Sequence, residues 1–405
     1  MVAILFVINS SCLKSKKPGF PPEIIEILNN SDIHKPGYLR ILLTYRLPED
    51  SLKLKSAYFI LKNLESNYSV IQSLADTSDN EIIIDINDFS NFGDIQNYLD
   101  SIELSAGKLH YKTDSIWLDF KNIDPDFLIN HIDTSFFVWE TTQSNQYDFN
   151  DFCQYILPYR VANEEVEYYI THFQNKYGHI AENNPSIPEI AKHLNSEINK
   201  KLKYDNRLEF DPNCRSIQEL EESGIGNLQE INIYKVKALR SLGIAAALDF
   251  TPYFADSTLG YYSTTVILPG KEKMYLVNTD KQENLYGDGN VAKVYRRTFH
   301  NVPECLFSIK DIEIHTPSYL GDFNYLDVTS EYMPTIDTSL LFNDTCNFVY
   351  VAVKNDDKLV AIDWSSPDST GLSTFKNLGK GIVYTPVVLI DKEMVKVGEH
   401  FEFKN

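Results

Sequence analysis

The residues of this chain that could do chemistry are its five cysteines and nine histidines. A thiolate attacks a carbonyl carbon when an imidazole takes its proton and a carboxylate or amide orients that imidazole. No two cysteines have the spacing of a CxxC redox or zinc motif, and neither HExxH nor HxxEH is present. The sequence therefore predicts no metal site and no cofactor. The cysteines are Cys12, Cys153, Cys214, Cys305 and Cys346.

Two of these thiols can be judged from their local sequence. Cys153 lies in FCQYILPYR (152–160), where a buried small hydrophobic residue is expected. Cys214 lies in DPNCR (211–215), a loop before a predicted helix, and would need a fixed electropositive setting to react. Five histidines are candidate bases by residue type alone: His172, His179, His193, His300 and His315.

One stretch of the chain could place a nucleophile at the start of a helix. GIGNL (224–228) opens a helix that runs towards Arg240, and SLGIAAALDFTP (241–252) then predicts a strand and a Thr-Pro turn. A helix N-terminus lowers the pKa of a thiol through its dipole, so the last residue of GIGNL would be well placed for catalysis. That residue is Leu228, which has no lone pair to attack with.

This succession of a GxGx start, a helix, RSLGI and a strand resembles the core of the transglutaminase-like, papain-like cysteine superfamily. The chain is similar in particular to a group of bacterial lipoproteins, and the resemblance covers most of its length. Several segments in the same order carry it: PEDSLKLK (48–55), FCQYILPYR (152–160), RSLGI (240–244), DFTP (249–252), AKVYRR (292–297) and DVTSEY (327–332).

The resemblance implies a catalytic cysteine, histidine and carboxylate, and it identifies their positions in this chain. The cysteine position is Leu228. The histidine of the family's GHSWN motif falls on Tyr262, or on Tyr261 with a different gap, and the third position falls at residues 278–280, where Asp280 is a carboxylate. Because the nucleophile and the base are both replaced, we predict a degenerate site with no intact catalytic residue.

The predicted function is therefore non-catalytic binding of a peptide, protein or glycan in the former cleft. Tyr261, Tyr262, Asn227 and Gln229 are the predicted binding residues, since tyrosines offer aromatic contacts to such ligands. One alternative is an active cysteine hydrolase or acyl transferase with a relocated nucleophile, acting on glutamine side chains or peptide bonds. Another is a cell-surface scaffold that docks a partner through its C-terminal region.

The N-terminus and the net charge bear on location and partners. An apolar run at residues 2–8 followed by small residues and Cys12 resembles a lipoprotein signal, which predicts an exported protein anchored to the membrane, periplasmic or on the cell surface, by a lipid on Cys12. A buried first strand at residues 2–8 is the alternative. With 37 basic and 57 acidic residues the net charge is −20, which disfavours nucleic acid as a partner. The oligomeric state stays open.

The chain divides into four predicted parts, and the predicted fold class is α+β. Residues 1–20 form the export signal and linker, 21–142 a mainly helical region, 143–312 the transglutaminase-like core, and 313–405 a small β-sandwich. In the second part, Asp124 and Pro125 predict a helix start and the isoleucines at 82–84 a short strand. In the last part, strands are predicted at 348–353, 359–364 and 382–389.

Overall fold

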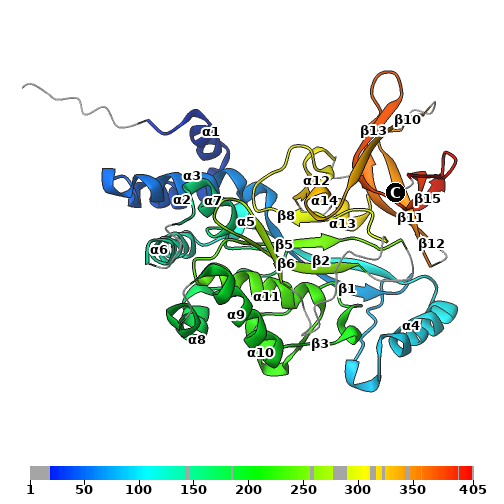
Figure 1. Ribbon diagram of the computed structural model, residues 1–405, viewed down its shortest axis with the longest axis horizontal. Coiled ribbons are helices and arrows are strands. Elements are labelled where there is room, and N and C mark those ends of the chain that lie inside the picture. The colour runs from blue at the N-terminus through cyan, green and yellow to red at the C-terminus, as the bar shows by residue number, and fades with distance from the viewer. Residues whose placement is uncertain are drawn as a thin grey trace, which may run out of the picture.

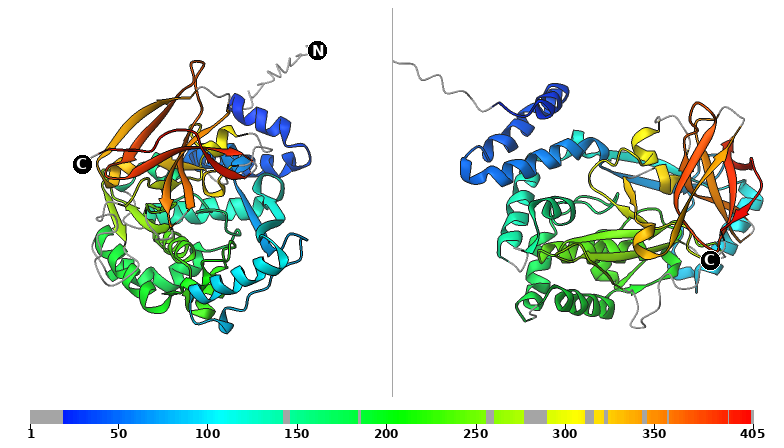
Figure 2. Two further views of the ribbon diagram at one scale, coloured as in Figure 1. Left: turned by 90° about the vertical axis from the view of Figure 1, so that its right-hand side faces the viewer. Right: turned by 45° about the horizontal axis from the view of Figure 1, so that its top comes forward.

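The fold of the chain is α+β, with helices and several separate β-sheets in one molecule. The computed structural model describes residues 19–141, 146–183, 186–255, 260–276, 290–310, 316–321, 324–342, 346–356, 358–390 and 392–403. The N-terminal helices and the C-terminal strands lie at opposite ends of the long axis, with a central sheet between them (Figures 1 and 2). The predicted fold class is confirmed at this level.

A five-stranded antiparallel sheet with one helix packed on it forms the centre of the molecule. The strand order is β7-β6-β5-β8-β9. The strands are β5 (Ala246–Thr251), β6 (Tyr261–Ile267), β7 (Lys273–Leu276), β8 (Tyr295–Arg297) and β9 (Tyr325–Asp327). Every residue of β5 is buried, as expected for an apolar run that is covered on both faces. Helix α11 (Leu228–Ser241) packs against β5 and β6, which confirms the predicted succession of helix and strands.

Helices at the N-terminus share one hydrophobic core with α11. They are α1 (Pro22–Asn30), α2 (Lys35–Thr44), α3 (Ser51–Asn63) and α6 (Pro125–Thr141). Helix α6 begins at the predicted proline, and the Asp124 side chain accepts the N–H of Asp126. The core continues through α7 (Phe149–Tyr155), α8 (Ile170–Asn183) and α9 (Ile187–Lys201) to β6. Burial of this shared apolar surface joins the N-terminal helices to the central sheet.

The region 21–142 also contains two antiparallel strands that were not predicted. β1 (Tyr68–Ala75) pairs with β2 (His110–Leu118), and α4 (Phe92–Ala106) lies between them in the chain, before α5 (Asp119–Asn122). No residue of β2 is buried, so the alternation that usually signals a strand is missing. The strand predicted at residues 82–84 was wrong, because those residues lie in no strand and only the neighbouring Glu81 forms an isolated bridge.

Short elements connect α9 to α11 and the central sheet to the C-terminal strands. Before α11 lie β3 (Lys203–Tyr204), α10 (Ile217–Ser223) and β4 (Ile225–Gly226), and β3 pairs with β4 in parallel. After β8 come α12 (Leu306–Ile309), α13 (Ser318–Gly321) and α14 (Thr329–Tyr332). Gly224, at the end of α10, has a φ of +67°, a left-handed backbone that glycine adopts without strain.

The C-terminal region is rich in strands and forms two sheets. One pairs β10 (Thr335–Leu341) with β13 (Leu372–Gly379), and the other has the order β12-β11-β14-β15, with β16 also on β14. Its strands are β11 (Val349–Asn355), β12 (Lys358–Ser365), β14 (Val383–Ile390), β15 (Glu393–Lys396) and β16 (Phe401–Glu402). The three strands predicted here are confirmed. In the part of the chain that is described, no helix has both the length and the apolarity to cross a membrane.

Candidate functional site

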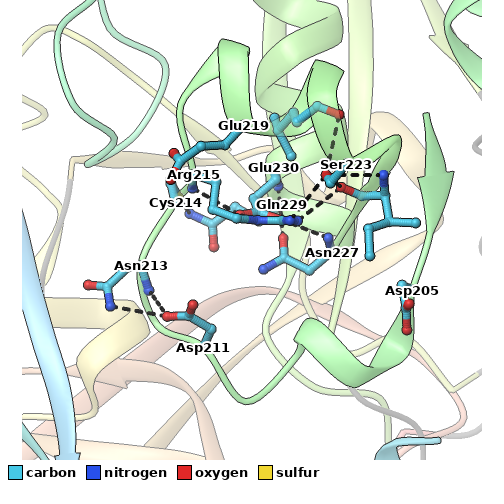
Figure 3. Close-up of polar contacts among 12 residues, drawn as sticks. Asp205, Asp211, Asn213, Cys214, Arg215, Glu219, Ser223, Asn227, Gln229 and Glu230 are labelled. Atoms are coloured by element: carbon cyan, nitrogen blue, oxygen red, sulfur yellow. Dashed lines mark hydrogen bonds and ion pairs between the residues drawn. The ribbon is translucent and has the colours of Figure 1, made fainter. Parts of the chain in front are cut away.

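The N-terminus of α11 is covered by residues 209–215, called here the covering loop. The loop contacts three successive residues of the helix: Leu228, Gln229 and Glu230. Figure 3 shows Cys214 and Arg215 beside Gln229 and Glu230 at the first turn. The end of the helix that would activate a nucleophile is therefore occupied by the chain itself.

Asn227 and Glu230 explain why the helix begins where it does. The Asn227 side chain accepts the Glu230 N–H at 2.9 Å, and the Glu230 carboxylate accepts the Asn227 N–H at 2.9 Å. This reciprocal pair is the capping box expected from a polar N-cap with glutamate three residues later. Asn227, predicted to bind ligand, is buried, and its side chain caps the helix.

The backbone N–H of Leu228 is engaged by a carboxylate from the covering loop. It donates to Oε1 of Glu209 at 3.3 Å. The positive end of a helix favours an anion at this place, and Glu209 supplies one from within the chain. Burial nevertheless raises the pKa of Glu209 above its usual range, although the Leu228 N–H partly offsets that rise.

We expect Glu209→Gln to remove part of the pH dependence of stability. Because the folded-state pKa of Glu209 is raised, its ionised form disfavours folding, and stability should fall as pH rises from about 4.5 through that raised value. Glutamine keeps an acceptor for the Leu228 N–H but carries no charge.

Urea unfolding at pH values between 4.5 and 7 measures the effect. The variant should be more stable than the wild type at pH 7, and its free energy of unfolding should change less with pH. Glu26→Gln, on the exposed face of α1, is the matched control. A profile that is unchanged in Glu209→Gln would contradict this role.

Arg215 anchors the covering loop to the same helix. Its backbone N–H and Nε donate to Oε1 of Glu230 at 2.9 and 3.0 Å, and its Nη2 donates to Oε2 at 2.8 Å. Nη2 also donates to the carbonyl oxygen of Ile225 at 3.0 Å. Two parallel bonds from a guanidinium to a buried carboxylate fix orientation as well as distance. The loop is therefore held in one position over the helix.

Cys214 lies in the covering loop, where burial and carboxylates outweigh the effect of the Lys237 cation on its pKa. Its sulfur accepts a hydrogen bond from Nε2 of Gln229 at 3.7 Å, which gives that predicted binding residue an internal partner. Burial raises the pKa of Cys214 well above its usual range, and the Glu230 and Glu164 carboxylates raise it further. No described histidine donates to or accepts from this sulfur. A thiol in this setting stays protonated and unreactive at neutral pH.

We expect Cys214 to resist alkylation in the folded protein. At pH 8, iodoacetamide should label it at least about ten-fold more slowly than in the chain unfolded by guanidinium, because little thiolate forms. Labelled peptides separated by mass would distinguish it from the other cysteines. Rapid labelling of Cys214 in the native protein would show that the thiol is ionised and accessible.

Tyr262, which the resemblance aligns with the base, lies on β6 close to the start of α11. The Asn232 amide, one turn into the helix, donates to the Tyr262 carbonyl at 3.1 Å and to the Leu228 carbonyl at 2.8 Å. The Tyr262 ring stacks on Phe250 with centroids 6.0 Å apart. Burial raises the pKa of Tyr262 to about 12, and nearby Cys214 and Glu209 add to the rise. A neutral phenol cannot replace imidazole as a base at neutral pH.

The other residues predicted for the site lie apart from it or outside the described residues. Tyr261 begins β6 opposite Thr251 and is half-buried. Asp280, Cys12 and His315 are not among the described residues. His172 pairs with Glu221 at 2.8 Å on the surface, His179 and His193 are exposed, and burial lowers the pKa of His300. In the described part of the chain no group of three or more potential ligands could hold a metal ion.

Several segments that carry the resemblance place charged side chains in the core. Arg296 donates to both oxygens of Asp249 at 2.8 Å and to Glu331 at 2.9 Å. Tyr332 and Thr265 donate to the same Asp249 carboxylate at 2.6 and 2.7 Å. DFTP, AKVYRR and DVTSEY thus meet in one buried ionic cluster, called here the Asp249 cluster. The cluster joins β5, β8 and α14, and it contains no nucleophile.

A second set of buried charges joins α5 and α11 to the segment between α7 and α8. Asp119 accepts from Nε of Arg160 at 2.9 Å and from the Tyr159 hydroxyl at 2.8 Å. Nζ of Lys237, on α11, lies 3.4 Å from Glu164 and 2.9 Å from Glu167. Charges this deep are tolerated because each has a partner of opposite sign.

A surface groove opens between the β1–β2 strand pair and the segment that precedes α8. It has a volume of about 300 Å³ and is lined by Ser69, Ile71, Ser115, Trp117, Glu165 and Val166. The cross-strand neighbours Ser69 and Trp117, and Ile71 and Ser115, present one face of the pair to it. A volume at the lower end of ligand pockets suits one or two side chains of an extended ligand. This groove could not be predicted from the sequence, because neither β1 nor β2 was predicted.

The covering loop contacts the strand on one side of this groove, and Ile217, just beyond the loop, contacts the segment on the other side. The Asn213 side chain accepts the Gln72 N–H of β1 at 2.9 Å and donates to the Gln72 carbonyl at 2.8 Å. On the other wall, the Glu167 carboxylate accepts the N–H of Ile217, just beyond the loop, at 2.9 Å. The covering loop therefore contacts both the N-terminus of α11 and the strand β1 beside the groove.

Comparison with known proteins adds one distant similarity. No family model matches the chain, and no curated protein matches it. A solved structure from Parabacteroides distasonis, described as a "putative protease", matches at 14% sequence identity with a TM-score of 0.24. The match covers 52% of this chain and 34% of that one, so the chain spans about a third of that protein. A TM-score this low assigns neither a fold nor a function.

Proposed function

We propose that this chain is a non-catalytic, peptide-binding protein with a transglutaminase-like arrangement of helix and sheet. The observation that carries the proposal is the contact between the Glu209 carboxylate and the Leu228 N–H. In an active enzyme of that class, a thiolate would need the positive end of this helix. Here a leucine stands at the position and a carboxylate of the chain occupies the helix end.

The relative positions of α11 and β6 support the transglutaminase-like part of the proposal. The helix whose first residue is Leu228 packs on the strand that carries Tyr262, and Asn232 joins the two backbones. These are the two elements on which the resemblance expects nucleophile and base. The packing of α11 on β6 is thus compatible with leucine at the nucleophile position and tyrosine at the base position.

The groove beside the covering loop supports the peptide-binding part. Its walls combine apolar side chains with hydroxyl and carboxylate groups, the mixture found in ligand sites. The alternative of a relocated nucleophile at Cys214 has no imidazole or electropositive group to support it among the hydrogen bonds of the described residues. Export with a lipid on Cys12 and docking of a partner on the C-terminal strands stay predictions.

The proposal is tested by measuring binding and turnover on the same peptides. Pools of hexapeptides with blocked ends would be incubated with the full chain, and the retained and the cleaved or transamidated fractions measured by mass spectrometry. We expect saturable retention and no product. Product formation that iodoacetamide abolishes would establish a cysteine enzyme, and absence of retention from every pool would remove the peptide-binding function.

A further inference from the structure

The groove contains an exposed tryptophan opposite a carboxylate. The Trp117 side chain comes from β2 and is 55% exposed, although tryptophan is on average a highly buried residue. Glu165 lies on the other wall, in the segment between α7 and α8, and is also exposed. An indole face attracts cations through its quadrupole, and a carboxylate attracts them through its charge. The two groups together favour a cationic ligand.

Glu165 differs from the glutamates on either side of it. Glu164 and Glu167 both lie within 3.4 Å of Lys237 and are committed to that internal cation. Glu165 makes no hydrogen bond or ion pair with any described residue. Its charge is therefore available to a ligand, and the net charge of −20 adds a field of the same sign around the groove.

The apolar residues of the groove define the rest of the ligand. Ile71 and Val166 line it together with Trp117, and Ile71 is 45% exposed. Long basic side chains lay their methylene stem on such surface while the charged end reaches a polar group. Between lysine and arginine, the planar guanidinium of arginine stacks better on an indole and pairs with a carboxylate through two parallel donors.

The walls of the groove are fixed before any ligand binds. β1 is held at Gln72 by the Asn213 amide, and the opposite segment is held at Glu167 by Ile217 and Lys237. Glu164 also accepts the N–H groups of Val161 and Ala162 at 2.9 and 2.7 Å. A site whose walls are already in place loses little conformational entropy on binding.

We propose that this groove binds an arginine side chain of an extended peptide, with the guanidinium between the Trp117 indole and the Glu165 carboxylate. The inference rests on the proposed peptide-binding function and specifies which peptides are bound. Ile71 and Val166 contact the methylene stem of the arginine. Ser69 and Ser115 supply the hydroxyl groups of the groove.

The test uses five hexapeptide pools with blocked ends, identical random flanks and one fixed third residue: arginine, lysine, citrulline, leucine or glutamate. Citrulline has the shape of arginine without its charge. The wild-type chain should retain the arginine pool at least about five-fold better than the citrulline pool, the size expected for a cation between an aromatic ring and a carboxylate. Trp117→Ala and Glu165→Gln should each remove most of this preference. Trp117→Phe should keep part of it, because phenylalanine has a weaker quadrupole.

Two matched variants control for general effects. Phe137→Ala removes another exposed aromatic ring, 59% exposed on α6, and should leave the arginine preference intact. Glu165→Lys should abolish retention of the arginine pool, whereas Glu26→Lys makes the same charge change on α1 and should not. Equal retention of the arginine and citrulline pools, or an arginine preference that survives Trp117→Ala, would overturn the inference while the peptide-binding function stands. Retention of no pool at all would instead remove the proposed function.

Discussion

Replacing Arg296 with methionine is expected to lower the free energy of unfolding by about 3–5 kcal/mol, the cost of leaving one member of a buried ion pair alone. Arg296 is 1% exposed and makes two hydrogen bonds to Asp249, which is fully buried. Without the guanidinium, the Asp249 carboxylate keeps only the Tyr332 and Thr265 hydroxyls. Those two neutral donors do not replace a positive charge at 2.8 Å. Urea unfolding followed by circular dichroism measures the loss.

Two further variants separate the buried pair from charge in general. Lys396→Met removes an exposed lysine 3.5 Å from Glu399, and we expect less than about 0.5 kcal/mol because such pairs are solvated. Combining Arg296→Met with Asp249→Asn should cost less than the sum of the two single changes, because the second removes the charge that the first leaves unpaired. Additive losses, or an Arg296 variant as stable as wild type, would rule out this account of the Asp249 cluster.

Lys237→Met is the second change for which we expect a large loss, again about 3–5 kcal/mol at pH 7. Methionine is unbranched and only one atom shorter than lysine, so packing on α11 changes little. The variant leaves Glu164, 4% exposed, with one fewer cation near it, while Arg160 remains. A carboxylate in this core that loses one of its two nearby cations is destabilised because water does not replace the lost charge.

The pH dependence of this variant distinguishes lost charge from lost packing. In the wild type, burial alone would raise the pKa of Glu164, but Lys237, Arg160 and two backbone N–H groups outweigh it and the pKa is lowered. That contribution to stability is complete above about pH 4.5 and is lost as pH falls through the lowered value. Without Lys237 the pKa rises, so Glu164 takes up a proton sooner. The stability difference between variant and wild type should therefore shrink from pH 7 to pH 5, and a difference independent of pH would indicate packing alone.

The elements around Leu228 could be predicted because their local signals agree with their burial. The N-cap and glutamate of NLQE mark the start of α11, and the apolar run before Pro252 marks β5. β1 and β2 could not be predicted in the same way. They pair over an intervening helix, and β2 has no buried residue to produce an alternating pattern. The groove formed on these strands therefore could not be predicted from the pattern of apolar residues.

The contacts of the candidate site could not be predicted from the sequence. The resemblance identified the positions of Leu228 and Tyr262, and in the structure these residues lie on neighbouring elements joined through Asn232. It could not show that Glu209, nineteen residues before Leu228, reaches the same helix end. Likewise, Asp249 and Arg296 are 47 residues apart, and nothing in one sequence identifies them as partners. Such pairs depend on tertiary packing, which local propensity does not encode.

The Asn213 side chain covers part of the free edge of β1. A carboxamide has the same donor and acceptor as a peptide group, and this one satisfies both polar groups of Gln72 on the edge of β1 that β2 does not cover. It therefore stands where a strand from a second molecule would otherwise pair. Exposed strand edges are templates for intermolecular aggregation, and proteins commonly block them with loops or charges. In this chain the Asn213 amide covers that edge at Gln72, and the segment after β1 covers it at Leu74, whose carbonyl accepts the Ile82 N–H. We therefore expect the loop that covers the helix end to disfavour edge-to-edge pairing of two molecules as well.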